Sequence, residues 1–209
     1  MKTAILIDLD NTIFDTRSWR VGFWKFFSDH ISSDTEVKVI AMLEDNLKNK
    51  AVFAPDRVMP RDEWKHLKEY MKKIGPQFLF SDTHDFLKNI NRQKYDPMIL
   101  TFGGAKFQRA KIAPLNLGLP AVFLEHHDKT AEIETWWRGD YYDINGRKFA
   151  QIILVDDQDY SFMDFEKLPQ ARGFWLQRPE SPTPSEKARF KSLLPTNVEA
   201  VTNLMGIKI

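Results

Sequence analysis

Five short apolar runs, each bounded by polar or turn-forming residues, indicate where the chain forms buried strands. They span residues 4–9, 98–102, 121–124, 152–155 and 173–176. From residue 98 onward, helical patterns at 106–115 and 130–137 separate these runs, and both have the length of crossover connections. Strands that alternate with crossover helices are typical of a parallel sheet covered on both faces. The pattern therefore predicts an α/β fold with a doubly wound, Rossmann-like parallel sheet.

The interval between the first and second runs breaks this alternation, because it has about ninety residues where a crossover needs only about a dozen. Three amphipathic helical patterns fill it, at 18–31, 34–48 and 60–74. The last begins with a proline and stops at Gly75-Pro76, as helix ends prefer. We therefore expect two units: an α/β core domain of residues 1–15 and 81–209, and an α-helical cap domain of residues 16–80 inserted into it.

Other patterns have an ordinary structural interpretation. The aromatic residues at helical spacing in 19–27 favour a buried core over a substrate pocket, although they could line one. Asp82 is positioned to cap a helix over 82–90. The histidine pair His126-His127 suits a solvated loop, and the Ser/Pro cluster from Arg178 to Ser185 predicts a surface loop before the last helices.

Composition narrows the class of protein. The chain has 209 residues, 43% of them hydrophobic, and its 30 basic residues nearly balance its 29 acidic ones. With a net charge of +1 and no long basic run, we expect neither a nucleic acid nor a membrane as partner. The absence of cysteine excludes disulfides, thiolate nucleophiles and cysteine-ligated metals. No signal peptide or membrane-length apolar run is evident, so we expect a cytoplasmic protein. We also expect a monomer or homodimer.

The most informative segment is the end of the first apolar run, Asp8-Leu9-Asp10-Asn11-Thr12. Two acids at positions i and i+2 after a strand can both face one Mg²⁺ ion, one through its side chain and the other through its backbone carbonyl. The second carboxyl group then remains free to transfer protons. An ordinary acidic turn is the alternative interpretation.

The other strand ends carry complementary groups. The second run ends in Thr101 before Phe102-Gly103-Gly104, and the fourth ends in Asp156-Asp157. In open parallel sheets ligands bind beyond the carboxyl ends of the strands, so these groups should meet. With a lysine from the third strand's exit, they would make a phosphoryl-transfer site: a carboxylate nucleophile, a hydroxyl and a cation for phosphate oxygens, and acids for magnesium.

These motifs resemble those of the haloacid dehalogenase-like (HAD) hydrolase superfamily, phosphatase type, with a helical cap inserted after the first motif. The matching elements, in the family's order, are Asp8-Leu9-Asp10-Asn11-Thr12, Ile99-Leu100-Thr101, Lys129 and Ile153-Leu154-Val155-Asp156-Asp157. The resemblance covers the core from residue 3 to about 178, while the inserted helices match only in their position. Together the four elements are specific, although each alone is not.

The resemblance implies a role for each matched residue. Asp8 attacks phosphorus to form an aspartyl-phosphate, and Asp10 protonates the leaving alcohol and then deprotonates water. Thr101 hydrogen-bonds the phosphoryl oxygens, and Lys129 neutralises Asp8 and the substrate. Lys129 follows the third run by the few residues of a strand-to-helix loop.

Two other lysines, Lys106 and Lys111, lie near the second strand and are the alternatives to Lys129. A lysine on a helix is usually solvated, so Lys129 is preferred, and which lysine completes the site stays open.

The implied cofactor is Mg²⁺, held by Asp8, by the backbone carbonyl of Asp10, and by the later acidic pair. Asp157 is the first choice for direct contact, with Asp156 orienting it or holding a metal-bound water. Many family members carry another acid four residues after the pair, where this chain has Ser161. Around these groups, we expect substrate contacts from Thr12, Phe14, Arg17, Gly103 and Gly104, and Arg20 is also close to the acids.

The sequence therefore predicts a magnesium-dependent phosphomonoester hydrolase that acts on a small phosphorylated metabolite. A phosphomutase uses the same four elements and stays an alternative, as does a non-catalytic binding protein of the same fold. A dehalogenase has no need of the second acid, Asp10, because a halide leaves without a proton. A response-regulator receiver has these groups in a different order and lacks the long insertion.

Overall fold

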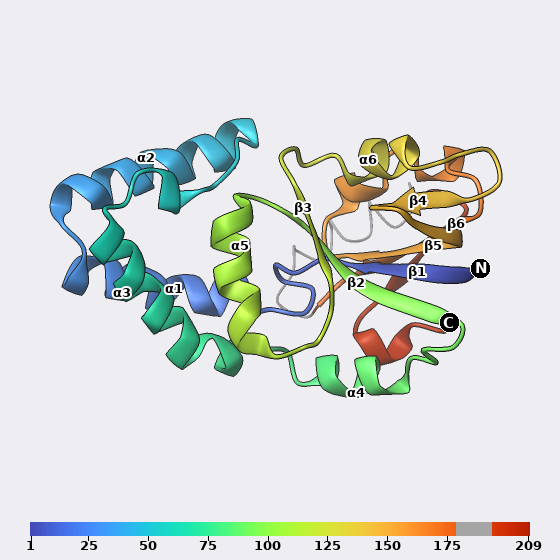
Figure 1. Ribbon diagram of the computed structural model, residues 1–209, viewed down its shortest axis with the longest axis horizontal. Helices are drawn as coiled ribbons and strands as arrows, with labels where there is room; N and C mark the ends of the chain where they lie inside the picture. The colour runs from blue at the N-terminus through green and yellow to red at the C-terminus, as the bar shows by residue number, and fades with distance from the viewer. Residues whose placement is uncertain (179–193) are drawn as a thin grey trace.

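The computed structural model describes residues 1–178 and 194–209, and it has an α/β architecture around one seven-stranded sheet (Figure 1). The strands are β1 (Lys2–Ile7), β2 (Tyr95–Phe102), β3 (Ala121–Leu124), β4 (Tyr142–Ile144), β5 (Arg147–Asp156), β6 (Ala171–Leu176) and β7 (Val198–Val201). Their order is β3-β2-β1-β5-β6-β7, with every neighbouring pair parallel, and β4 pairs antiparallel with β5. The predicted parallel sheet is confirmed, with one short antiparallel hairpin added.

Both faces of this sheet are covered, which explains why its strands read as continuous apolar runs. Ile5 and Ile7 belong to one buried cluster with side chains of α4 (Asp82–Asn89) and α5 (Ala105–Ile112). Leu6, on the opposite face, belongs to a second cluster with α6 (Lys129–Thr135) and the segment that follows β5. The sheet is therefore doubly wound, as predicted.

The segment 16–80, which we call the cap, lies to one side of the sheet and is helical (Figure 1). Its helices are α1 (Thr16–His30), α2 (Ser33–Asn49) and α3 (Arg61–Ile74). The side chain of Asp15 caps α1 by accepting a hydrogen bond from the Ser18 N–H at 3.0 Å. Of the aromatic side chains on α1, four are buried as expected: Trp19, Phe23, Phe26 and Phe27.

The chain enters and leaves the cap at one place. The Asp15 N–H donates to the Phe78 carbonyl at 2.7 Å, and the Phe80 N–H donates to the Ile13 carbonyl at 3.0 Å. The two crossings are therefore hydrogen-bonded to each other, directly after the loop that carries Asp10.

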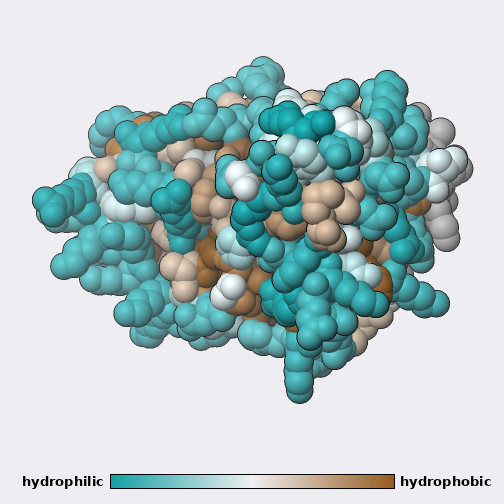
Figure 2. Space-filling model, turned by 45° about the vertical axis from the view of Figure 1, so that its right-hand side comes forward, coloured by the Kyte–Doolittle hydropathy of each residue, from teal (hydrophilic) through white to brown (hydrophobic). Residues whose placement is uncertain are grey.

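Short 3₁₀ helices complete the described chain, at Pro55–Arg57, Gly75–Phe78, Ala113–Leu115, Asp159–Phe162, Phe165–Lys167 and Leu204–Gly206. No helix in residues 1–178 and 194–209 has the length and apolar character needed to cross a membrane. On the face drawn in Figure 2, hydrophilic side chains cover most of the surface and the hydrophobic ones gather toward the middle.

Two expectations, at Asp82 and at Arg178, are wrong. Ser81 is the N-cap of α4 and Asp82 is its first residue; the Asp82 carboxylate accepts from the Leu204 N–H and from Arg178. Arg178 is only 7% exposed, since its guanidinium also donates to the Thr12 carbonyl at 2.6 Å. It therefore lies in the interior rather than in a surface loop, and the rest of that predicted loop, with the start of the helices expected after it, lies outside the described residues.

Candidate active site

The candidate site lies at the carboxyl ends of four adjacent strands: β3, β2, β1 and β5. Asp8 follows β1 directly, and its N–H donates to the Val155 carbonyl of β5 at 2.9 Å. In the register of the sheet, Ile7 of β1 is paired with both Ile99 of β2 and Val155 of β5. This register explains why the residues after these positions, including Thr101 and Asp156, come together although they are far apart in sequence.

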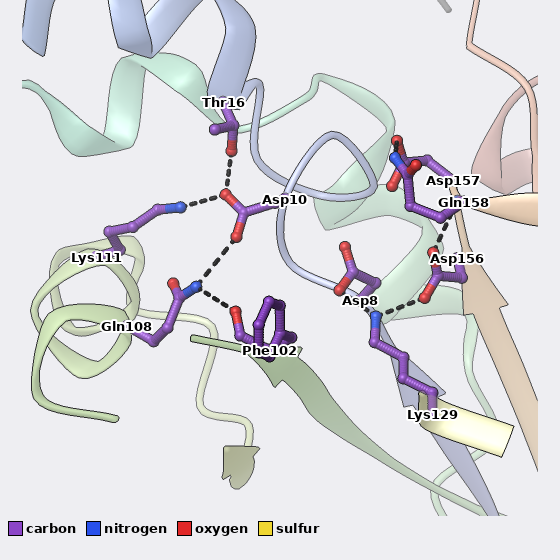
Figure 3. A network of polar contacts seen from close by, with 10 residues as sticks. All are labelled: Asp8, Asp10, Thr16, Phe102, Gln108, Lys111, Lys129, Asp156, Asp157 and Gln158. Carbon is purple, nitrogen blue, oxygen red and sulfur yellow. Dashed lines mark hydrogen bonds and ion pairs between the residues drawn. The ribbon is translucent and has the colours of Figure 1, made fainter. Parts of the chain in front are cut away.

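Three carboxylates meet there. Asp8, Asp156 and Asp157 each offer an oxygen within 4.8 Å of the others, and all three side chains are buried. The Lys129 ammonium is ion-paired with Asp8 and, at 2.5 Å, with Asp156 (Figure 3). Asp128 caps α6 by accepting from the Ala131 N–H at 2.9 Å, and this cap places Lys129 at the first helical position.

Burial and crowding shift the ionisation of this cluster. Burial raises the pKa of Asp8 to about 7, although Lys129 opposes the shift, and nearby Asp156 and Asp10 add to it. Burial also raises the pKa of Asp157 well above its usual range, with Asp156 and Asp8 contributing. Burial would lower the pKa of Lys129, but its two carboxylate partners outweigh burial and raise it.

This donor set fits a magnesium ion. Three buried carboxyl groups face one lysine, and carboxylate oxygens are the ligands that Mg²⁺ prefers, so a bound cation would favour the ionised forms whose pKa burial raises. The backbone carbonyl of Asp157 accepts from the Trp175 indole N–H at 3.0 Å, which holds this residue in place. Ser161 is 1% exposed and lines the same cavity.

Two hydroxyl groups at the site have no hydrogen-bond partner among the described residues. They are the Oγ1 of Thr101 and the Oγ of Ser161, both buried and both on residues that line the cavity. A polar atom buried without a partner costs roughly 1–3 kcal/mol, so a ligand oxygen that bonded to it would be favoured. The arrangement agrees with the phosphate-binding role predicted for Thr101.

Asp10 lies in a second network, on the cap side of the site. Its carboxylate accepts hydrogen bonds from Lys111, Thr16 and, at 3.2 Å, the side-chain amide of Gln108 (Figure 3). Burial would raise the pKa of Asp10, but the three donors, Lys111 foremost, outweigh burial and lower it. The resting structure therefore holds Asp10 ionised.

Lys111, an alternative to Lys129 in the sequence analysis, lies in this second network, and its pairing with Asp10 was not predicted. Rather than being solvated, it is only 3% exposed, and its ammonium lies 5.0 Å from the ring centre of Phe14 and 5.3 Å from that of Trp19. Gln108 and Lys111 are three residues apart on α5, so they share a helix face with each other. Their spacing beside an apolar helix face is the sequence feature that could have predicted a buried position for Lys111.

A cavity of about 260 Å³ connects these groups with the cap. Of the expected substrate contacts, Gly103 lines it, whereas Thr12, Phe14, Arg17 and Gly104 do not. Phe14 is 1% exposed and packs against Trp19 and Phe78, so it is part of the core. Arg20 does line the cavity, and so does His127, which was expected in a solvated loop.

The two glycines differ: Gly103 lines the cavity as expected, whereas Gly104 contacts the cap. The Gly103 N–H donates to the Leu124 carbonyl at 3.1 Å, and the Gly104 N–H donates to the Phe53 carbonyl of the cap at 3.1 Å. A Cβ atom on Gly104 would lie 2.5 Å from the Cβ of Ala54. The close approach that Gly104 permits is therefore to the cap loop rather than to an anion.

Known structures share this fold. A haloacid dehalogenase-like hydrolase from Burkholderia xenovorans LB400 matches with a TM-score of 0.66 and 14% identity, covering 97% of this chain and 93% of that one. The magnesium-bound HAD-hydrolase YfnB from Bacillus subtilis matches with a TM-score of 0.53 and 14% identity, covering 98% and 96%. An L-2-haloacid dehalogenase from Xanthobacter autotrophicus, with chloropropionic acid covalently bound, matches at 0.53 and 16%, covering 98% and 96%.

The chain therefore has the fold of the HAD-like hydrolases. No protein-family model matches the sequence, and no curated protein matches it either.

Proposed function

We propose that this protein is a magnesium-dependent phosphomonoester hydrolase that acts through an aspartyl-phosphate intermediate. The observation that carries the proposal is the buried cluster of Asp8, Asp156, Asp157 and Lys129 at the strand ends, with Asp10 across the same cavity. The fold of the HAD-like hydrolases and the magnesium bound to the Bacillus subtilis neighbour support it.

In the first step, a carboxylate oxygen of Asp8 forms a bond to phosphorus while the bond from phosphorus to the alcohol oxygen breaks. Asp10 gives the departing oxygen its proton. In the second step Asp10 takes a proton from water, the water oxygen attacks phosphorus, and the bond to Asp8 breaks. Thr101 and Lys129 hold the phosphoryl oxygens during both steps. Bound magnesium would neutralise charge on the transferred group, held by Asp8, Asp157 and the backbone carbonyl of Asp10, with Asp156 supporting it.

For the first step Asp10 must carry a proton, whereas the resting network holds it ionised beside Lys111. Substrate binding therefore has to loosen this ion pair or raise the pKa of Asp10 by adding negative charge nearby. The Thr16 contact comes from the cap, so movement of the cap would change the same network.

The alternatives make different demands on the site. A dehalogenase has no use for Asp10, and a non-catalytic binding protein has no need of an intact set of acids. A phosphomutase would use the same residues and differ in whether water reaches the intermediate.

We further propose that residues 16–80 form a cap domain over a core of 1–15 and 81–209. In this proposal the protein is a cytoplasmic monomer or homodimer whose partner is a small phosphorylated metabolite.

A screen of phosphorylated metabolites with Mg²⁺, measuring released phosphate, tests the function. We expect release that stops with a chelator and returns with added Mg²⁺. The Asp8→Asn variant, measured in parallel, controls for contaminating phosphatases. Activity that survives chelation would overturn the proposal.

A further inference from the structure

Beyond the phosphoryl site, the cavity has an apolar wall that the proposed mechanism does not use. The cap supplies it from Trp24 on α1, Leu43 and Leu47 on α2, and Phe53 in the loop after α2. Trp24 and Phe53 are half-buried, and Leu47 is 57% exposed. Apolar side chains that are left partly exposed at a cavity can still gain free energy by covering a ligand.

The two aromatic side chains of this wall pack against other rings that line the cavity. The ring of Trp24 meets the buried ring of Phe23 edge-on, with 5.1 Å between centroids. The ring of Phe53 meets that of Phe107 in the same way, at 5.3 Å and 87°. Edge-to-face contacts of this kind are favourable, so the wall is formed before a ligand arrives.

Polar groups on the cap side are few. Among residues 16–80, all of them described, no acidic side chain lines the cavity, and the polar side chains that do are Thr16, Arg20 and Asn46. The Thr16 hydroxyl is already bonded to Asp10, and the Asn46 amide nitrogen donates to the Ala51 carbonyl at 2.6 Å. A leaving group with several hydroxyls would therefore find Arg20 but few other partners on the cap side, which is unfavourable.

We propose that this wall binds the alcohol part of the substrate, and that the preferred substrates are phosphate monoesters whose alcohol carries a flat apolar group such as an aryl ring. This inference rests on the proposed function and adds the substrate class. The phosphoryl cluster and the wall share one cavity, so a single ester can reach both. Its volume of about 260 Å³ is just below the roughly 300–1,000 Å³ usual for ligand pockets, which favours one ring over a larger body.

The test compares 2-phenylethyl phosphate with glycerol 3-phosphate, because both release a primary alcohol and so make similar demands on the chemistry. Turnover is measured with Mg²⁺ on the wild-type protein, and binding is measured by calorimetry on the Asp8→Asn variant. We expect 2-phenylethyl phosphate to have a kcat/KM and an affinity at least about tenfold higher, the scale on which apolar pockets discriminate.

Two variants locate the effect. Trp24→Ala should raise KM for 2-phenylethyl phosphate by about tenfold while changing that for glycerol 3-phosphate little. Trp137→Ala is the matched control, since Trp137 is also half-buried but packs against Tyr142 on the core, away from the cavity, and it should leave both values unchanged.

The outcomes separate the inference from the function. Equal or better use of glycerol 3-phosphate, with no effect of Trp24→Ala, would overturn the substrate class and leave the phosphatase intact. Tight, Trp24-dependent binding of 2-phenylethyl phosphate without turnover of any ester would overturn the phosphatase and support the wall as a binding site. Failure of the Asp8→Asn variant to distinguish the two esters would also overturn the substrate class.

Discussion

The site contains two pairs of an acid and a lysine: Asp8 and Lys129 are both buried, whereas Lys111 is buried and the Asp10 side chain is 29% exposed. The two pairs also differ in charge balance. Asp8 and Lys129 lie beside two further acids, Asp156 and Asp157, so three carboxyl groups there share one lysine. Among the described residues, Asp10 is bonded to Lys111 and to the neutral donors Thr16 and Gln108, so one acid there faces one lysine. The surplus of carboxyl groups in the first cluster favours a bound cation, which together with Lys129 can hold a phosphoryl group. The one-to-one pairing of Asp10 with Lys111 favours a single orientation of the Asp10 side chain.

The two pairs also differ in where their residues come from. Asp8 and Lys129 follow the ends of β1 and β3, so the core alone positions them. The Asp10 network joins the core helix α5 with Thr16 of the cap. We infer that the first pair performs the chemistry on phosphorus and that the second adjusts proton transfer to the state of the cap.

The largest effect is expected for Asp8→Asn, which keeps the shape of the side chain and removes the nucleophile. Turnover should fall by several orders of magnitude, on the order of 10⁴-fold or more. The melting temperature, measured alongside, should not fall, because the change removes one charge from an over-acidic cluster. Turnover near the wild-type rate would end the proposed mechanism.

Asp10→Ala should act through the leaving group. We expect a loss of about 10²–10⁴-fold for alkyl phosphates, the range of general acid catalysis, and a much smaller loss for aryl phosphates, whose oxygen departs with less need of a proton. Initial rates across a series of esters with different leaving groups measure this. Equal losses along the series would show that Asp10 is not the acid.

Removing the lysine of the first pair should also lower kcat, by less than the Asp8 change does. Lys129→Ala takes one preorganised charge from the transferred group, and a loss on the order of a hundredfold in kcat is expected. Lys106→Ala is the control, because Lys106 has a 60% exposed side chain and should change kcat less than about twofold. If kcat collapsed in Lys111→Ala and stayed nearly unchanged in Lys129→Ala, our assignment of Lys129 as the phosphate-binding lysine would be wrong.

The smallest effect is expected at the second pair. Lys111→Met keeps much of the side-chain volume but removes the ion pair that orients the Asp10 carboxyl group. Although the pKa of Asp10 should rise, the lost orientation should slow alkyl phosphates by about tenfold and change aryl phosphates little. Lys111→Arg keeps the positive charge beside Asp10, so its rate with alkyl phosphates should lie between those of Lys111→Met and the wild type. If both variants fold equally well, a purely structural role for Lys111 would not explain this difference. Lys106→Met, on the exposed side of the same helix, provides the comparison. An equal loss for both ester types would make Lys111 a structural residue only.

The sequence predicted the first pair better than the second, for a physical reason. Strand ends in a parallel sheet meet at one edge, so Asp8, Thr101 and Asp156 could be placed together from the apolar runs alone. The burial of Lys111 depends on how α5 packs against the aromatic side chains of the cap, which no local pattern records. The same holds for Arg178, whose burial depends on a carbonyl of the loop after β1.

The limits of local patterns are visible in the fold as well. The buried strands β1, β2, β3, β5 and β6 were predicted from their apolar runs, with ends that differ by a few residues. The short β4 and the edge strand β7 were not, because the first is a three-residue arm of a hairpin and the second carries Glu199 in a run of only four residues.

The central claim is that Asp8 becomes phosphorylated, and trapping the intermediate tests it most directly. The Asp10→Ala variant should form the aspartyl-phosphate from an aryl phosphate and hydrolyse it slowly, since the base for water is missing. After an acid quench in the presence of Mg²⁺, peptide mass spectrometry should find one added phosphoryl group on the peptide that contains Asp8. The Asp8→Asn, Asp10→Ala double variant should carry none. A phosphoryl group on any other residue, or the same amount in the double variant, would contradict the account.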